Sequence, residues 1–122
     1  MILVDTSVWV DHLRDGEATL VKLLHQNLVC THPMVIGELA CGNLHNRKQL
    51  LALLHNLPSA IEARPHEVLA FVESHQLMGK GVGFIDLQLL ASCLLSPRTT
   101  LWTRDKRLTG IANTLNLGFT SQ

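Results

Sequence analysis

The sequence of 122 residues predicts an α/β fold, with a central, mostly parallel sheet of four or five strands flanked by helices. Two observations favour this fold. Short apolar runs, suited to strands buried on both faces, alternate along the chain with longer stretches of helical spacing. This alternation is typical of parallel βαβ units with right-handed crossovers. The length and a hydrophobic content of 47% fit one domain, residues 1–122.

The first predicted strand, residues 2–4, ends abruptly at Asp5. Either Thr6 or Ser7 then suits the N-cap of a helix that turns Leu13 toward the core. In open parallel sheets, ligands bind at such strand-to-helix junctions, beyond the carboxyl ends of the strands. The junction at Asp5 is therefore the first candidate site.

Proline and glycine residues mark the boundaries of the remaining elements. Pro33 and Pro65 suit the first turn of a helix, whereas Gly42 and Gly79 follow the last turn of one. Apolar residues between these boundaries recur at helical spacing, and short apolar runs fill the gaps. Helices are therefore expected at residues 18–27, 33–41, 47–57, 65–78, 87–95 and 106–116, and short strands at 28–30, 60–63, 99–103 and 117–120.

Four of the ten acidic residues fall at or near such junctions: Asp5, Glu38, Asp86 and Asp105. Each has a structural explanation when taken alone. Asp5 or Asp105 can cap a helix, Asp86 can interact with a helix dipole, and Glu38, among apolar neighbours, can pair with a buried arginine. Because the carboxyl ends of parallel strands meet at one rim of a sheet, we expect the four side chains to converge.

Converging carboxylates require a counterion. Two of them about 5 Å apart repel by roughly 3 kcal/mol at an effective dielectric of about 20. No lysine or arginine adjoins Asp5, Glu38 or Asp86 in the sequence. Oxygen-only ligands suit Mg²⁺ or Mn²⁺, which can activate water and neutralise charge on a phosphoryl group.

Composition limits the function classes. Ten basic and ten acidic residues give a formal net charge of zero, which argues against binding nucleic acid mainly through a broad basic surface. Aromatic residues make up 4% of the chain and tyrosine is absent, which argues against an extended base-stacking surface. One local excess of basic residues, between Gly79 and Gly110, is either a solvated face or a local grip on a polyanion. Its members are Lys80, Arg98, Arg104, Lys106 and Arg107.

The expected location is the cytoplasm. The apolar runs are far shorter than a membrane span, and the opening lacks a basic segment leading into a signal-like core. Three cysteines, an odd number, are typical of reduced thiols, and we expect them in the core.

Four short segments together resemble PIN-domain ribonucleases, above all the VapC-type toxins of bacterial and archaeal toxin–antitoxin pairs. They are DTSVW, MVIGELACG, a GxGFxDxxLLA segment around Asp86, and WTRDKRL. The resemblance covers essentially the whole chain. It implies an endoribonuclease dependent on Mg²⁺ or Mn²⁺ that hydrolyses RNA phosphodiester bonds to leave a 5′-phosphate and a 3′-hydroxyl. It further implies a homodimer and a cognate antitoxin that blocks the site.

The resemblance also implies roles for individual residues. Asp5 and Asp86 are the expected direct metal ligands, and both are catalytic. Glu38 and Asp105 complete the acidic site by holding a second ion, a water or the active geometry. Hydrogen bonds to these ligands are expected from Thr6, Ser7 and Thr103.

Other interpretations remain open. Cys30 with His32 and Cys41 with His45 offer two ligand pairs for zinc, although their spacing matches no common zinc motif. A phosphatase-like or receiver-like α/β domain would need a second acid near Asp5, which is missing. A catalytically silent interaction module is the third class. Core packing is the expected role of both tryptophans, and the leucines of residues 50–57 suit either the core or a dimer contact.

Overall fold

Three parallel strands form the centre of the molecule. The computed structural model describes residues 1–120, so Ser121 and Gln122 of the predicted domain lie outside the described residues. The sheet has the order β2-β1-β3, with β1 at Ile2–Val4, β2 at Val29–Cys30 and β3 at Thr100–Trp102. Leu3 of β1 is in register with Cys30 on one side and Leu101 on the other. All three residues of β1 are buried, as a strand covered on both faces requires.

The prediction of four or five strands is wrong, because only three strands form within residues 1–120. Each further expected strand is replaced by a single parallel bridge at an edge: Thr31 with Ser59 beside β2, and Leu101 with Gly118 beside β3. The segment after Ser59 leaves the sheet because its amides find other acceptors. Ile61 N–H donates to Ser96 Oγ (2.8 Å) and Ala63 N–H to Ser92 Oγ (3.0 Å), both on or next to a helix.

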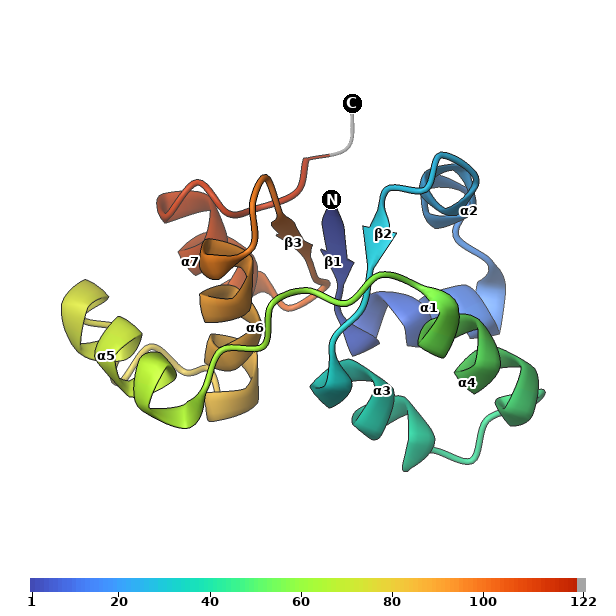
Figure 1. Ribbon diagram of the computed structural model, residues 1–122, viewed down its shortest axis with the longest axis horizontal. Coiled ribbons are helices and arrows are strands. Elements are labelled where there is room, and N and C mark those ends of the chain that lie inside the picture. Colours follow the sequence, from blue (N-terminus) through green and yellow to red (C-terminus); the bar gives the residue numbers. More distant parts are fainter. Residues whose placement is uncertain (121–122) are drawn as a thin grey trace.

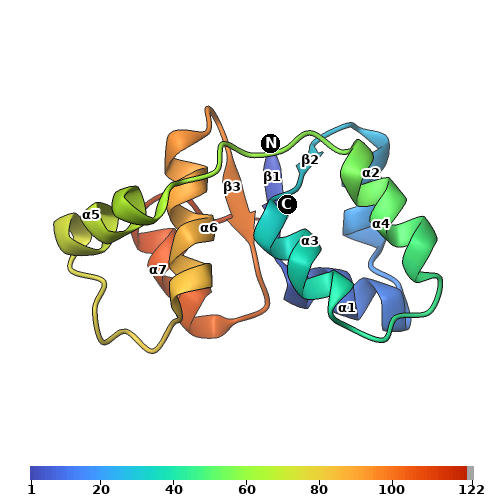
Figure 2. The same ribbon diagram turned by 60° about the horizontal axis from the view of Figure 1, so that its bottom comes forward.

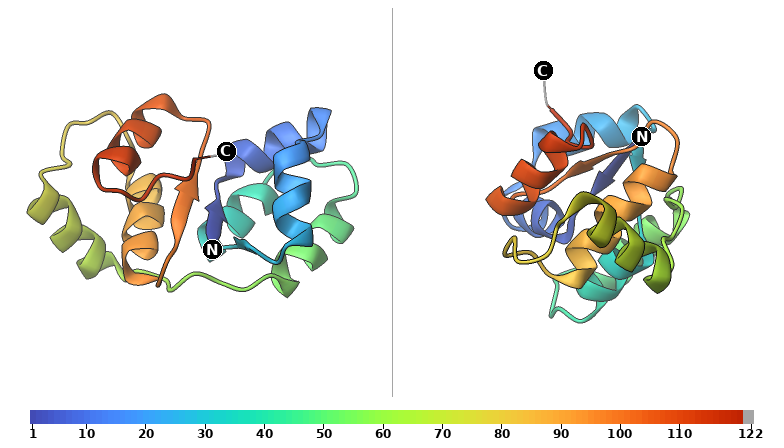
Figure 3. Two further views of the ribbon diagram at one scale, coloured as in Figure 1. Left: turned by 90° about the horizontal axis from the view of Figure 1, so that it is seen from above. Right: turned by 90° about the vertical axis from the view of Figure 1, so that its left-hand side faces the viewer.

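Helices cover the sheet in two groups. Figures 1 and 2 show α1–α4 gathered on one side of the strands and α5–α7 on the other. Residues 57–64 cross between the two groups, as Figure 3 shows from above. The helices are α1 (Thr6–Asp15), α2 (Ala18–His25), α3 (Pro33–Ala40), α4 (Arg47–Asn56), α5 (Pro65–His75), α6 (Phe84–Leu95) and α7 (Lys106–Thr114). None of them, within residues 1–120, is long and apolar enough to span a membrane.

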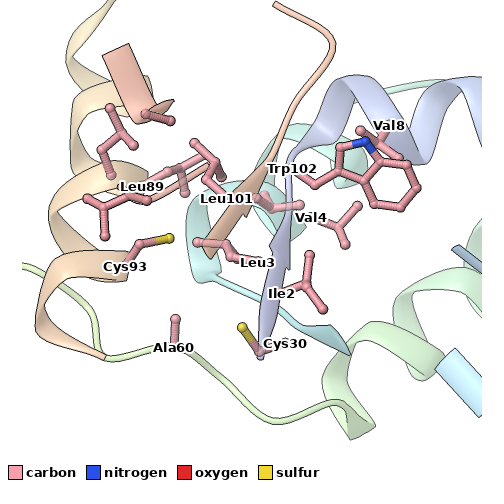
Figure 4. Packing of buried hydrophobic residues seen from close by; sticks show 14 of the residues in the cluster. Ile2, Leu3, Val4, Val8, Cys30, Ala60, Leu89, Cys93, Leu101 and Trp102 are labelled. Atoms are coloured by element: carbon pink, nitrogen blue, oxygen red, sulfur yellow. The ribbon is translucent and has the colours of Figure 1, made fainter. Parts of the chain in front are cut away.

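The core joins both helical groups through the sheet. Figure 4 shows Leu3 and Leu101 of the strands beside Leu89 and Cys93 of α6. Burial raises the pKa of the Cys93 thiol to about 12, so this thiol stays protonated at neutral pH. Trp9 is 1% exposed, which confirms its predicted packing role. Two other predictions are wrong: Cys41 and Leu13 are exposed.

A buried polar link joins the two groups. His32, fully buried, caps α3 by accepting a hydrogen bond from Met34 N–H on Nδ1 (3.1 Å). Its Nε2 lies 3.0 Å from Ser92 Oγ of α6. Because Nδ1 is an acceptor, the ring proton sits on Nε2 and donates to Ser92. Both ring nitrogens are thus occupied by structural hydrogen bonds.

Candidate active site

Two of the four acids are helix N-caps that stand side by side at the sheet rim. Asp5 follows β1 and caps α1, and Asp105 follows β3 and caps α7 by accepting from Arg107 N–H (2.9 Å) and Leu108 N–H (3.0 Å). The Asp5 amide donates to the Trp102 carbonyl (2.9 Å), which fixes the two junctions together. The predicted cap at Thr6 or Ser7 is wrong because α1 already begins at Thr6.

The Asp5 carboxylate is held by hydroxyls from both junctions. Its side chain is buried, and Oδ2 accepts from Ser7 Oγ (2.7 Å) and Thr103 Oγ1 (2.9 Å). Each hydroxyl in turn accepts a backbone amide: Arg104 N–H for Ser7 (3.0 Å) and Asp105 N–H for Thr103 (3.1 Å). Their protons are therefore committed to Oδ2. Within the described chain Oδ1 has no protein donor, which leaves it free for a ligand.

Glu38 reaches the same rim from α3. Its side chain is exposed, and Oε1 accepts a hydrogen bond from Thr6 Oγ1 (3.0 Å). Val35 and Leu39 form the buried face of α3, so helical spacing turns Glu38 outward despite its apolar neighbours in the sequence. The alternative of a buried arginine partner is wrong, since no ion pair among residues 1–120 includes Glu38.

Asp86 lies in the first turn of α6 and is half-buried. Burial raises its pKa most, and the charge of Asp5 raises it next; the Gly83 backbone amide opposes the shift, and Asp105 and Glu38 add smaller increases. All three other acids thus repel a charge on Asp86. The structure brings the four sequence-predicted acids into one electronegative neighbourhood.

The site fits a hydrated hard cation better than a closed metal centre. Among residues 1–120, no three His, Cys, Asp or Glu side chains lie close enough to hold an ion together. Mg²⁺ needs only one or two direct carboxylate ligands and keeps several waters. Asp5, with Oδ1 open, and Asp86 are carboxylates of that kind, whereas the zinc alternative does not fit, because both nitrogens of His32 are engaged and no cluster of possible zinc ligands forms in the described chain.

Sequence reasoning missed the role of Arg104. Its guanidinium donates to Asp11 Oδ2 (3.0 Å) and pairs with Glu17, and it lies 5.4 Å from the centre of the Trp102 ring. It thereby ties the junction after β3 to the α1–α2 segment. No local pattern marks this role, because the two acidic partners lie 93 and 87 residues away in the sequence.

A glycine before Asp86 permits a close approach between two segments of the chain. Gly81 has φ +81°, and a Cβ there would lie 2.5 Å from Arg107 Nη1. Any other residue there would be strained in this left-handed backbone conformation and would have to displace the Arg107 side chain. The segment that leads into α6 therefore lies directly against α7.

Comparisons with known proteins agree with this geometry. The family model of the PIN domain matches residues 2–113. Two curated relatives, both named Ribonuclease VapC32, come from Mycobacterium tuberculosis strains CDC 1551 / Oshkosh and ATCC 25618 / H37Rv. Each is 48% identical over 108 residues, which make up 88% of this chain and 87% of the relative.

Proposed function

We infer that this chain, which belongs to the PIN-domain family, is a ribonuclease toxin of the VapC type. It is an endoribonuclease of a toxin–antitoxin system, with RNA as its substrate and a cognate VapB antitoxin as its partner. Its activity depends on a metal ion, as is typical of the family. The expected family and activity agree with the comparisons.

The finer proposal is that the ion is Mg²⁺ or Mn²⁺ and that Asp5 and Asp86 are its direct ligands. When bound, such an ion supplies an activated water and neutralises charge on the RNA phosphate. Ser7 and Thr103 hold Asp5 in one orientation and leave Oδ1 open toward the site. Glu38 and Asp105 complete the acidic site and hold water or a second ion at its exposed side.

The observation that supports this proposal best is the mutual repulsion of the acids. The pKa of Asp86 is raised first by burial and then by all three other carboxylates, and no lysine or arginine is among the groups that shift it in the described chain. A divalent cation removes that repulsion and lets the negatively charged RNA backbone approach. The same charges without a cation would repel a phosphate placed among them.

The test is RNA cleavage with Mg²⁺ or Mn²⁺ and with EDTA. We expect cleavage with either ion, none in EDTA, and loss of at least about a hundredfold in Asp5→Asn and Asp86→Asn, because each removes a metal-binding charge. The matched control is Asp15→Asn, an exposed acid outside the site. Mapping the product ends tests the expected 5′-phosphate and 3′-hydroxyl. Undiminished cleavage by Asp86→Asn would overturn the residue assignment, and an inactive wild type would favour the silent module.

We also propose that residues 1–122 form one nuclease domain that works as a homodimer in the cytoplasm. The leucines of α4 give only partial support for a contact there, because Leu50 and Leu54 are buried in the core while Leu53 is exposed. The expected antitoxin contact is an arginine inserted among the acids, which would compete with the metal. Light scattering tests the dimer, and cleavage in the presence of the cognate antitoxin tests the block.

A further inference from the structure

A second polar site lies beside the acids. A pocket of about 380 Å³, open to solvent, lies between the carboxyl end of α5, the loop after it and one face of α7. Three permanent cations line it: Lys80 from the loop, and Lys106 and Arg107 from the first turn of α7. His75 lies at its α5 end. We call it the cationic pocket.

The charges of the cationic pocket are uncompensated. No acidic residue lines it, and within residues 1–120 Lys80, Lys106 and Arg107 take part in no ion pair. Arg14 and Arg104, by contrast, are paired with acids. In a chain of zero net charge, three unpaired cations around one pocket make a local positive field that attracts an anion.

The pocket also has apolar walls. Leu77 is buried and Ile111 half-buried, and both line it. The His75 ring packs against Phe71, with ring centres 5.0 Å apart. Cations beside an apolar surface and a flat ring suit a nucleotide, whose phosphate needs charge and whose base and ribose need apolar or stacking contact.

Two segments of the chain connect the pocket to the acidic site. Lys106 directly follows Asp105, and the Arg107 amide donates to Asp105 Oδ1 (2.9 Å). On the other wall, the loop from Lys80 passes Gly81, against the Arg107 side chain, and leads into Asp86. An RNA chain with one phosphate at the acids can therefore place a neighbouring nucleotide in the cationic pocket.

We propose that the cationic pocket is an RNA subsite that binds a backbone phosphate and its nucleoside next to the phosphodiester bond that is cleaved. This inference rests on the proposed function. The pocket holds substrate in register, and the acids carry the chemistry. An acidic peptide is the competing occupant.

The test measures RNA binding without cleavage. A short fluorescein-labelled single-stranded RNA of mixed sequence is titrated with the full chain in EDTA, and polarisation gives Kd over a range of salt. The variant is Lys80→Gln/Lys106→Gln/Arg107→Gln. The matched control is Lys22→Gln/Lys48→Gln/Arg98→Gln, which removes two lysines and one arginine that are exposed and in no ion pair in the described structure.

We expect the pocket variant to bind at least about tenfold more weakly than the control, with a salt slope smaller by about 0.7 for each phosphate that the pocket no longer neutralises. With Mg²⁺, we expect the pocket variant to raise KM while kcat at saturating RNA stays near that of the control. Equal Kd values and slopes for the two variants would overturn the inference, whether or not the wild type cleaves RNA. Binding of poly-glutamate by the pocket, with RNA affinity unchanged in the variant, would assign it to an acidic partner and also overturn it.

The two proposals fail separately. A wild type that cleaves RNA, with indistinguishable variants, retains the nuclease and rejects the subsite. A wild type that cleaves nothing, with RNA binding abolished in the pocket variant alone, rejects the nuclease and retains an RNA-binding pocket.

Discussion

At the scale of single residues, the Asp5 carboxylate shows how the site is prepared for a ligand. Two hydroxyls occupy Oδ2, and two backbone amides orient those hydroxyls. Oδ1 is left open in the described chain. Removing a group that orients a metal ligand in this way typically costs about 10- to 100-fold in metal affinity or activity.

Thr103→Val tests this arrangement. Valine keeps the shape of threonine but cannot donate to Asp5, so we expect metal affinity and cleavage to fall about 10- to 100-fold with the fold intact. The comparison is Thr100→Val in β3, whose hydroxyl takes part in no hydrogen bond among the described residues. Calorimetric titration with Mn²⁺ and initial rates measure both quantities. Equal losses in the two variants would contradict the role of Thr103.

Asp86→Asn tests the cost of a charge at Asp86, which comes first from burial and then from the neighbouring carboxylates. The folded-state pKa of Asp86 is raised above 3.8, so its contribution to stability is full below 3.8 and is lost as pH rises through the folded-state value. At neutral pH the ionised group therefore destabilises the metal-free protein. We expect Asp86→Asn to raise Tm in EDTA by on the order of a few degrees while abolishing cleavage. A lowered Tm at pH 7 would show that the charge is already compensated.

The position of a site residue was predictable where the neighbouring sequence alone determines it. Asp5 follows an apolar run directly, and Asp105 follows one after Thr103 and Arg104, which marks both as junction residues without a structure. The exposure of Glu38 was not evident, since its neighbours are apolar and only the rotation of α3 turns it outward. The ion pairs of Arg104 could not be predicted from the sequence, because they depend on contacts between distant parts of the chain.

At the scale of elements, Asp105 has two roles that can be separated by mutation. It caps α7 through two backbone amides, and it contributes charge to the site. Asparagine keeps a cap of similar strength, whereas alanine costs about 1 kcal/mol. We expect Asp105→Asn to keep the stability of the wild type and lose activity, and Asp105→Ala to lose both. Urea unfolding and cleavage rates separate the two, and an active Asp105→Asn would confine the residue to capping.

His32 links α3 to α6 and makes stability depend on pH. Burial lowers its pKa in the folded protein below 6.5, and Glu62 opposes this only weakly. The unfolded chain therefore takes up the proton first. Above pH 6.5 the neutral His32 ring makes its full contribution to the free energy of unfolding. As the pH drops below 6.5, we expect the free energy of unfolding to fall by at most about 1.4 kcal/mol per pH unit.

The comparison for this pH dependence is His32→Asn. Asparagine can still accept from Met34 N–H as an N-cap but does not titrate. Above pH 6.5 its Tm should be lower than that of the wild type, because the hydrogen bond to Ser92 is lost. Between about pH 6.5 and pH 5 its Tm should fall less steeply than that of the wild type. Parallel curves for the two proteins would assign the acid sensitivity to other groups.

Helices were easier to predict than sheet edges for a physical reason. Helical hydrogen bonds are local, so proline, glycine and apolar spacing located all seven helices of the described chain to within a few residues. Strand pairing depends on distant partners. Residues 60–63 have a strand-like composition, but their amides donate to Ser92 and Ser96, which sequence spacing cannot reveal.

At the scale of the whole molecule, a net charge of zero conceals two opposed regions. The acids gather at the sheet rim, and three unpaired cations line the adjoining pocket. Summed charge argues against a broad basic surface but could not indicate this separation, because the separation depends on how the loop before α6 meets α7. The proposed subsite depends on this separation, because one RNA strand must contact both regions at once.

The acids also come from both helical groups. Asp5 and Glu38 belong to the α1–α4 side, and Asp86 and Asp105 to the α5–α7 side (Figure 1). An ion bound between Asp5 and Asp86 therefore adds a crosslink that is absent from the unfolded chain. Ligand binding to the folded state alone stabilises it by RT ln(1 + [L]/Kd), about 2.7 kcal/mol at a hundredfold excess over Kd. Metal should thus stabilise the molecule as a whole.

We expect Mn²⁺ or Mg²⁺ to raise the Tm of the wild type and of Asp15→Asn by several degrees, with EDTA reversing the shift. Asp86→Asn, more stable than the wild type without metal, should gain little when metal is added, so the two Tm values converge or cross as the ion concentration rises. Scanning calorimetry at fixed pH measures this convergence. A shift of equal size in Asp86→Asn would mean that the ion binds elsewhere, because a ligand removed from the site cannot leave the stabilisation by that site unchanged.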